Sequence, residues 1–192
     1  MTGIIILAAG SSSRLGQSKQ NLVFKGKTLL QRAIETAVAS VCEPVIVVLG
    51  ANAEIIEPTI KNYEVNIVYN ADWNEGMSSA IRAGISALIK IEHNVQSVIL
   101  MLCDQPFTDT YVVNHLIMAS DASGIAASVY NNTVGPPVLF DAIYFKDLMA
   151  LKGVEGAKKV IQKYPGKVVE VLFPQGNIDI DTMEDFEKIN RK

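Results

Sequence analysis

Short runs of aliphatic and β-branched residues alternate along the whole chain with segments of helical periodicity, and this alternation constrains the fold more than any other feature. The runs predicted as strands are residues 4–8, 44–50, 65–70, 97–104, 125–130, 136–140 and 167–173. The first, second and fourth are apolar throughout, as in strands covered on both faces. Alternating strands and helices predict an α/β fold with a mostly parallel sheet. Residues 125–140 are richer in turn residues, and there the parallel pattern could change.

The segments between these runs carry the helical pattern. Residues 28–40 and 78–90 each place their apolar side chains on one face. N-caps are predicted at Ser78 or Ser79, at Thr108 and at Thr182, because a hydroxyl there can accept from free N–H groups of the first turn.

Composition excludes several classes of protein. The 192 residues suffice for one domain, and the net charge of −3 argues against nucleic acid or a membrane surface as a partner. Cys42 and Cys103 have no CxxC spacing and are expected to be reduced core thiols. Neither a membrane span nor a signal peptide is evident, so we expect a cytoplasmic protein.

The loop after the first strand, "LAAGSSSRLGQSK" (7–19), is the strongest candidate for a binding site. Ligands of open α/β sheets bind beyond the carboxyl ends of the strands. Gly10 and Gly16 can take positive φ, which lets successive N–H groups hold phosphate oxygens, and Arg14 and Lys19 supply charge. The spacing fits neither the P-loop nor the dinucleotide fingerprint. The alternative is a flexible connection with two solvated cations.

Three acids follow later predicted strands. Asp104 ends a buried strand, where an unpaired carboxylate would be costly, so a cation or hydrogen-bond donors should face it. Alternatively, Asp104 caps the following turn. Asp179 and Asp181 are two residues apart, and in a strand both would face the same side. Alternatively, one of them caps the last helix.

The loop after the third strand, residues 70–79, offers further candidates. Gly76 and a helix N-terminus at Ser78 and Ser79 could present N–H groups to a base edge or an anion. Trp73 could stack on a ligand or serve as a packing anchor. Arg82 lies one turn inside the helix and could simply be solvated.

The first loop resembles the L-A-A-G-x-S-x-R-x-G-x-x-K signature of the MobA-like NTP transferase family, which includes molybdenum cofactor cytidylyltransferase and guanylyltransferase. Residues 71–85, 102–106, 135–140 and 179–186 resemble the same family in order. The resemblance implies a Rossmann-like three-layer α/β/α nucleotidyltransferase fold and a single domain over 1–192. It also implies a nucleotide-binding half over about 1–105 and an acceptor-binding half over about 106–192.

The resemblance further implies a reaction and roles for single residues. A nucleotidyl group, CMP from CTP, would pass to a phosphorylated acceptor, a molybdopterin-type cofactor, with release of pyrophosphate. The Ala-Gly form of the signature goes with cytidylyl transfer. A molybdoenzyme or its chaperone would be a partner. Lys19, Arg14 and Asp104 would be catalytic, and Asp104 and Asp181 would hold Mg²⁺ with Asp179 nearby. The implied nucleotide-binding residues are Leu7, Ala8, Ala9, Gly10, Arg14, Lys19, Gly76, Ser78 and Ser79.

Two departures from the family pattern lie on the acceptor half. Pro136 stands where a His is frequent, and Val154 stands where an acid is frequent. Two other functions therefore stay open: a nucleotidyltransferase for a sugar or polyol phosphate, and an accessory protein that binds a nucleotide or pterin without catalysis.

Overall fold

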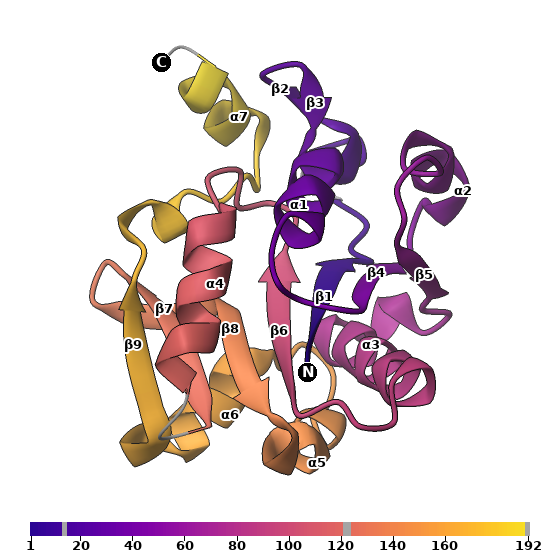
Figure 1. The fold of residues 1–192 in the computed structure, drawn as a ribbon. Helices are drawn as coiled ribbons and strands as arrows, with labels where there is room; N and C mark the ends of the chain where they lie inside the picture. Colours follow the sequence, from indigo (N-terminus) through magenta and orange to yellow (C-terminus); the bar gives the residue numbers. More distant parts are fainter. Residues whose placement is uncertain (13–14, 121–123, 191–192) are drawn as a thin grey trace.

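The computed structural model describes residues 1–12, 15–120 and 124–190, and its centre is a seven-stranded sheet in the order β5-β4-β1-β6-β8-β7-β9 (Figure 1). β8 runs antiparallel to both β6 and β7, whereas the pairs β5–β4, β4–β1, β1–β6 and β7–β9 are parallel. This confirms the mostly parallel sheet, and the change of direction falls within residues 125–140. The strands are β1 (Thr2–Ala8), β4 (Val45–Leu49), β5 (Asn66–Tyr69), β6 (Ser97–Leu102), β7 (Ile125–Tyr130), β8 (Thr133–Asp141) and β9 (Val168–Leu172).

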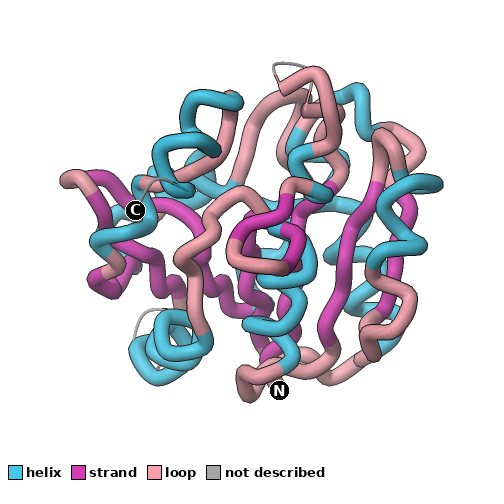
Figure 2. Tube along the Cα trace, turned by 90° about the horizontal axis from the view of Figure 1, so that it is seen from above, coloured by secondary structure: helices cyan, strands magenta, loops and turns pink. Residues whose placement is uncertain are grey.

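Helices cover both faces of the sheet, as the view from above shows (Figure 2). Ile4 and Ile5 are both fully buried because neighbouring side chains of a strand enter opposite cores. The core that holds Ile5 is closed by α3 (Met77–Ile91), α5 (Phe145–Met149) and α6 (Ala157–Lys163). The core that holds Ile4 is closed by α1 (Leu29–Val38), α2 (Ala53–Ile56) and α4 (Thr110–Ala119). The three-layer α/β/α architecture is therefore confirmed.

Two of the predicted N-caps are wrong. The N-cap of helix α3 is Gly76, two residues before Ser78 and three before Ser79, and the Ser79 hydroxyl donates back to the Gly76 carbonyl. Helix α4 is capped by Asp109, whose carboxylate accepts from the Val112 N–H at 2.9 Å. The backbone N–H of Thr108 instead bonds the Gln105 carbonyl in the preceding turn, so the helix starts beyond it.

The predicted cap at Thr182 is confirmed. Its hydroxyl accepts from the Asp185 N–H at 3.2 Å, and the Asp185 carboxylate accepts from the Thr182 N–H at 3.0 Å. This reciprocal pair is a capping box. It starts the last helix, α7 (Met183–Asn190), at a fixed point of the chain.

The last segment of the chain packs beside the first loop. A hairpin of β2 (Val23–Phe24) and β3 (Lys27–Thr28) lies next to α7 in Figure 1. Ile180 is fully buried, and its N–H donates to the Asp104 carbonyl at 3.0 Å. Residues 178–181 form no strand, so the shared orientation that a strand would give Asp179 and Asp181 does not apply, but this segment brings the late acids to the end of β6. The small core shared by the two ends contains Leu15, Leu22, Phe24, Leu29, Ile180 and Ile189.

Within the ranges described above, no helix is both long and apolar enough to cross a membrane.

Candidate active site

A cavity of about 520 Å³ opens at the carboxyl ends of β1 and β6. The loop after β1, the start of α3 and the end of β6 meet there, as expected for an open α/β sheet. The cavity brings together most of the residues that the sequence suggested. Among those it is lined by Leu7, Ala8, Ala9, Gly10, Lys19, Gly76 and Asp104. Arg14 lies outside the described residues.

Gln20, which sequence reasoning missed, holds the first loop in shape. It is fully buried, and its amide nitrogen donates to the carbonyls of Ala8 at 2.7 Å and Gly10 at 3.0 Å. Its amide oxygen accepts from the hydroxyls of Ser12 and Ser18. All of its hydrogen-bonding capacity is therefore spent inside the loop. Its only sequence signal is its position beside Lys19.

Lys19 joins two acids that are distant in sequence. Its ammonium Nζ lies 2.5 Å from Asp104 Oδ2 and 3.2 Å from Asp181 Oδ1. Burial alone would lower the pKa of Lys19, but the charge and hydrogen bond of Asp104 outweigh it, so the pKa is raised. The lysine stays charged, and the three groups form a compact ionic centre at the edge of the cavity.

One carboxylate oxygen of this centre lacks a partner. Asp104 Oδ1 is buried, and no described residue hydrogen-bonds it. A buried acceptor left open is costly unless a cation or a ligand satisfies it. The Asp104 turn cap considered from sequence is not formed, since Oδ2 binds Lys19 and Oδ1 binds no described group.

The arrangement fits a hard divalent cation. Mg²⁺ is held in such sites by one or two carboxylates together with substrate phosphates, and Asp104 with Asp181 would supply that pair. The described residues contain no cluster of three or more His, Cys, Asp or Glu side chains that could hold a metal by itself. A cation here would thus draw its remaining ligands from substrate and water.

Asp179 lies at the same edge of the site. Burial raises its pKa, and the nearby charges of Asp104 and Asp181 raise it further. Asp179 and Asp181 both line a second cavity, of about 670 Å³, on the side of the hairpin and α7. The two acids thus border a space beyond the Lys19 centre.

The serines at the start of α3 have internal roles. Ser78 and Ser79 are buried and are not among the described residues that line the cavity. The Ser78 hydroxyl accepts from Arg82, and that of Ser79 accepts from the Asn70 amide at 2.8 Å. The Ser78 N–H donates to the Gly153 carbonyl, so it is engaged within the protein. These serines stabilise the helix start, and Arg82 is not simply solvated.

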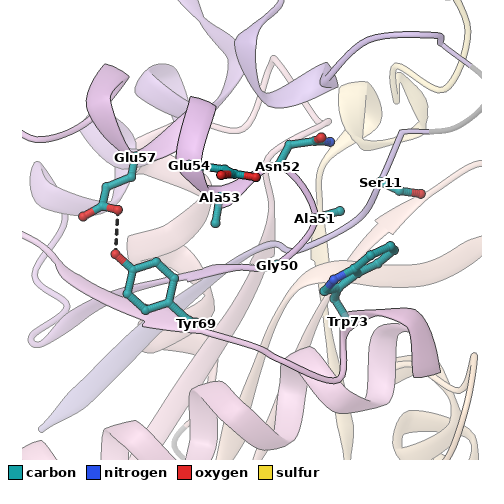
Figure 3. Close-up of a pocket in the computed structure, with 9 residues that line it drawn as sticks. All are labelled: Ser11, Gly50, Ala51, Asn52, Ala53, Glu54, Glu57, Tyr69 and Trp73. Carbon is teal, nitrogen blue, oxygen red and sulfur yellow. Dashed lines mark hydrogen bonds between the residues drawn. The ribbon is translucent and has the colours of Figure 1, made fainter.

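Trp73 borders two cavities. It lines the main cavity and a third one of about 630 Å³, shown in Figure 3, where Glu57 accepts a hydrogen bond from Tyr69 at 2.6 Å. The indole remains 40% exposed, although it packs closely on Gly50, where an added Cβ would lie 2.6 Å from Trp73 Cβ. Trp73 is therefore anchored at its base and open to a ligand at its ring.

Comparison with known proteins decides the family. Residues 4–168 match the MobA-like NTP transferase domain. The chain belongs to this family. A molybdenum cofactor cytidylyltransferase from Escherichia coli (strain K12) is 27% identical over 183 residues, which cover 95% of this chain and 92% of that protein. A nicotine blue oxidoreductase from Paenarthrobacter nicotinovorans is 28% identical over 200 residues, covering 98% of this chain and 96% of that protein.

A solved structure agrees with the fold. The crystal structure of a homologue of Mycobacterium tuberculosis Rv0371c, from Mycobacterium sp. strain JC1, superposes with a TM-score of 0.87 at 29% identity. The match covers 99% of this chain and 95% of that one. The family and its fold are thus established, while the two named relatives carry names of different reactions. The names of these relatives therefore do not fix the reaction of this MobA-like chain.

The two departures from the family pattern take different places. The Pro136 carbonyl accepts from the Gln105 amide at 3.1 Å, next to Asp104 in sequence. Val154 lines the main cavity itself. The second departure therefore changes the wall that a substrate would touch.

Proposed function

We propose that this MobA-like protein is a divalent-metal-dependent nucleotidyltransferase that joins a nucleoside triphosphate to a phosphorylated acceptor and releases pyrophosphate. One observation carries the proposal: the Lys19 ammonium, 2.5 Å from Asp104 and 3.2 Å from Asp181, stands beside a cavity lined by a glycine-containing loop. Positioning and charge stabilisation dominate phosphoryl transfer, and a fixed cation next to two carboxylates is suited to that task.

Asp104 and Asp181 would hold the metal, which we propose to be Mg²⁺. When bound, the ion would neutralise charge on the triphosphate. The open Asp104 Oδ1 supports this assignment, because it is a buried hard ligand with no described partner.

The chain's own residues account for binding and alignment. Lys19 would stabilise the phosphate oxygens by its charge, and backbone N–H groups around Ala9 and Gly10 would approach them closely. An oxygen of the acceptor phosphate would attack the α-phosphorus in line, forming one P–O bond while the bond to the β-phosphate breaks. Pyrophosphate then leaves with that electron pair. Arg14 is retained as a second phosphate-binding cation.

We propose CTP as the nucleotide. Ala9 is buried in the cavity wall, and its Cβ faces Gly50, where an added Cβ would lie 2.9 Å away. We propose that this methyl group narrows the wall against a purine, which needs more space than a pyrimidine. Discrimination by one methyl is about 1–3 kcal/mol. Ala9→Gly should therefore shift the kcat/KM ratio of CTP to GTP toward GTP, measured with the same acceptor; an unchanged ratio would remove Ala9 from nucleotide choice.

We propose a molybdopterin-type cofactor as the acceptor and a molybdoenzyme or its chaperone as the partner. The similarity to a molybdenum cofactor cytidylyltransferase supports this choice. The rivals are a sugar or polyol phosphate as acceptor, and a non-catalytic carrier of a nucleotide or pterin.

Pyrophosphate release across panels of nucleotides and acceptors separates these functions. Release with CTP and molybdopterin supports the proposal. Pyrophosphate release only with a sugar or polyol phosphate would identify that compound, and not molybdopterin, as the acceptor. Binding without release with any acceptor favours the carrier.

A further inference from the structure

The segment 151–155, in the acceptor half of the sequence, contributes Val154 to the wall of the main cavity. The segment lies beside the start of α3, where the Ser78 N–H donates to the Gly153 carbonyl at 3.2 Å. From this segment Val154 reaches the cavity. The inference below rests on the proposed function, since it concerns what this wall recognises.

An ion pair holds the segment in place. Glu75 and Arg82 are joined at 2.5 Å, and Arg82 Nη1 also donates to the Leu151 carbonyl at 2.8 Å. The Glu75 carboxylate accepts from the Gly153 N–H at 3.4 Å. Glu75 and Arg82 therefore bind each other and also hydrogen-bond the backbone of the segment. Val154 thus lies in a segment whose backbone is held by these hydrogen bonds.

Close backbone packing leaves the segment little room to move. Gly76 has φ 119°, and an added Cβ there would lie 2.6 Å from the Gly153 carbonyl oxygen. An added Cβ at Gly156 would lie 2.8 Å from Met77 Sδ. Two glycines thus permit the contact between the start of α3 and residues 153–156. A ligand that enters the cavity meets a preformed wall.

The lip of this wall is apolar. Val154 is 88% exposed, and Met77 and Trp73 are 41% and 40% exposed, although all three line the cavity. A single exposed valine is common on protein surfaces and does not indicate a binding site. Three apolar side chains around one cavity do indicate one, because ligand sites have a mostly apolar lining. Lys19 and Asp104 line the same cavity, which therefore offers both a charged and an apolar part.

We propose that Val154 is a specificity-determining residue that contacts an uncharged aromatic ring of a substrate, while the phosphates of that substrate face Lys19. The ring could belong to the nucleobase of the triphosphate or to a heterocyclic acceptor. Either source has a flat apolar face that Val154, Met77 and Trp73 can cover. The acid that is frequent at this position in the family would present a charge to the same ring.

Binding measurements on Val154 variants test the proposal. Trp73 is the single tryptophan of the chain, so its fluorescence reports occupancy of the cavity. The probes are CTP, GTP and ATP with Mg²⁺, neopterin as a phosphate-free heterocycle, and inorganic tripolyphosphate with Mg²⁺. The variants are Val154→Asn and Val154→Asp, which share one shape and differ in charge. Val41→Asn, at a valine 71% exposed and outside the main cavity, is the matched control.

Val154→Asn should weaken binding of the ring-bearing source about tenfold and leave tripolyphosphate within about twofold. Loss with the nucleotides assigns the ring to the nucleobase, and loss with neopterin assigns it to the acceptor. Unchanged affinity for all ring-bearing probes overturns the inference and leaves the proposed function standing, as does equal loss with tripolyphosphate. An unmodified protein that binds neither nucleotides nor neopterin contradicts both. Thermal unfolding checks that each variant is folded.

Discussion

Lys19 and Asp104 lie 85 residues apart in sequence, and their side chains meet at 2.5 Å. The register of the sheet accounts for this meeting. Leu7 and Leu102 are partners in neighbouring parallel strands, so the loops that follow them leave the sheet at the same edge. The two groups that we propose to act in the reaction are thus brought together by strand pairing.

Removing the cation of this pair should reduce catalysis. Charge-assisted contacts are worth about 1.5–3 kcal/mol, so Lys19→Ala should lower kcat/KM for the triphosphate by about tenfold or more. Lys61→Ala, at an exposed lysine outside the cavity, is the control. Full turnover of folded Lys19→Ala protein would exclude the loop from the mechanism.

The same variant should respond more strongly to divalent metal. Without Lys19, Asp104 and Asp181 lose the cation that they share, and removing one partner of such a partly buried ion pair is destabilising. We expect the metal-free Lys19→Ala protein to have a lower Tm than the unmodified protein. Addition of Mg²⁺ or Mn²⁺ should raise the Tm of the variant by more than it raises the Tm of the unmodified protein. Equal shifts in calorimetry would argue against a metal between these carboxylates.

The two carboxylates should be essential for metal-dependent turnover. Asp104→Asn and Asp181→Asn keep the size of the side chain and remove a charged hard ligand. Each should lower turnover by at least about a hundredfold at limiting Mg²⁺, since loss of a stabilising charge costs several kcal/mol. Asp109→Asn is a matched control, because Asn remains a good N-cap for α4. Full activity of the Asp104→Asn protein would show that Asp104 is not a metal ligand.

Gln20 should matter for both stability and activity. Gln20→Ala would leave the carbonyls of Ala8 and Gly10 without this donor, at about 1–3 kcal/mol for the buried Ala8 carbonyl and less for the more exposed Gly10 carbonyl. Urea unfolding should show a loss of stability of that order. The value of kcat should also fall, because the conformation of this loop positions Lys19. Gln17→Ala, at an exposed position of the same loop, should change little. A Gln20→Ala protein as stable as the unmodified one would contradict the role given to the amide.

The layers of the fold were predictable from sequence because strands buried on both faces leave an unbroken apolar pattern. The runs that include Ile4–Ile6 and Val45–Leu49 are such strands, and the structure buries them. Helix starts were less predictable where several polar residues compete. At Thr108 and Asp109 the carboxylate forms the cap, and before Ser78 the backbone freedom of Gly76 sets the start.

The charged residues of the site were predictable from sequence, whereas the residues that hold them in position were less so. Asp104 stands out because a charge at the end of a buried strand needs a partner, whereas Lys19 and Asp181 stand out through the resemblance to the family. Gln20 carries no such signal, since its role depends on where the loop turns back onto β1. The wall at Val154 was hidden for another reason. Its contact with Gly76 joins segments far apart in sequence, and only the packing of α3 against residues 151–155 brings them together.

Transfer of a label from CTP carrying a radioactive α-phosphate to the acceptor tests the central claim most directly. With molybdopterin and Mg²⁺, the label should appear in the acceptor product, while the released pyrophosphate stays unlabelled. CTP should be preferred over GTP, and Asp104→Asn protein should transfer no label. A folded, metal-loaded protein that transfers no nucleotidyl group from CTP, GTP or ATP to any phosphorylated acceptor would contradict the account.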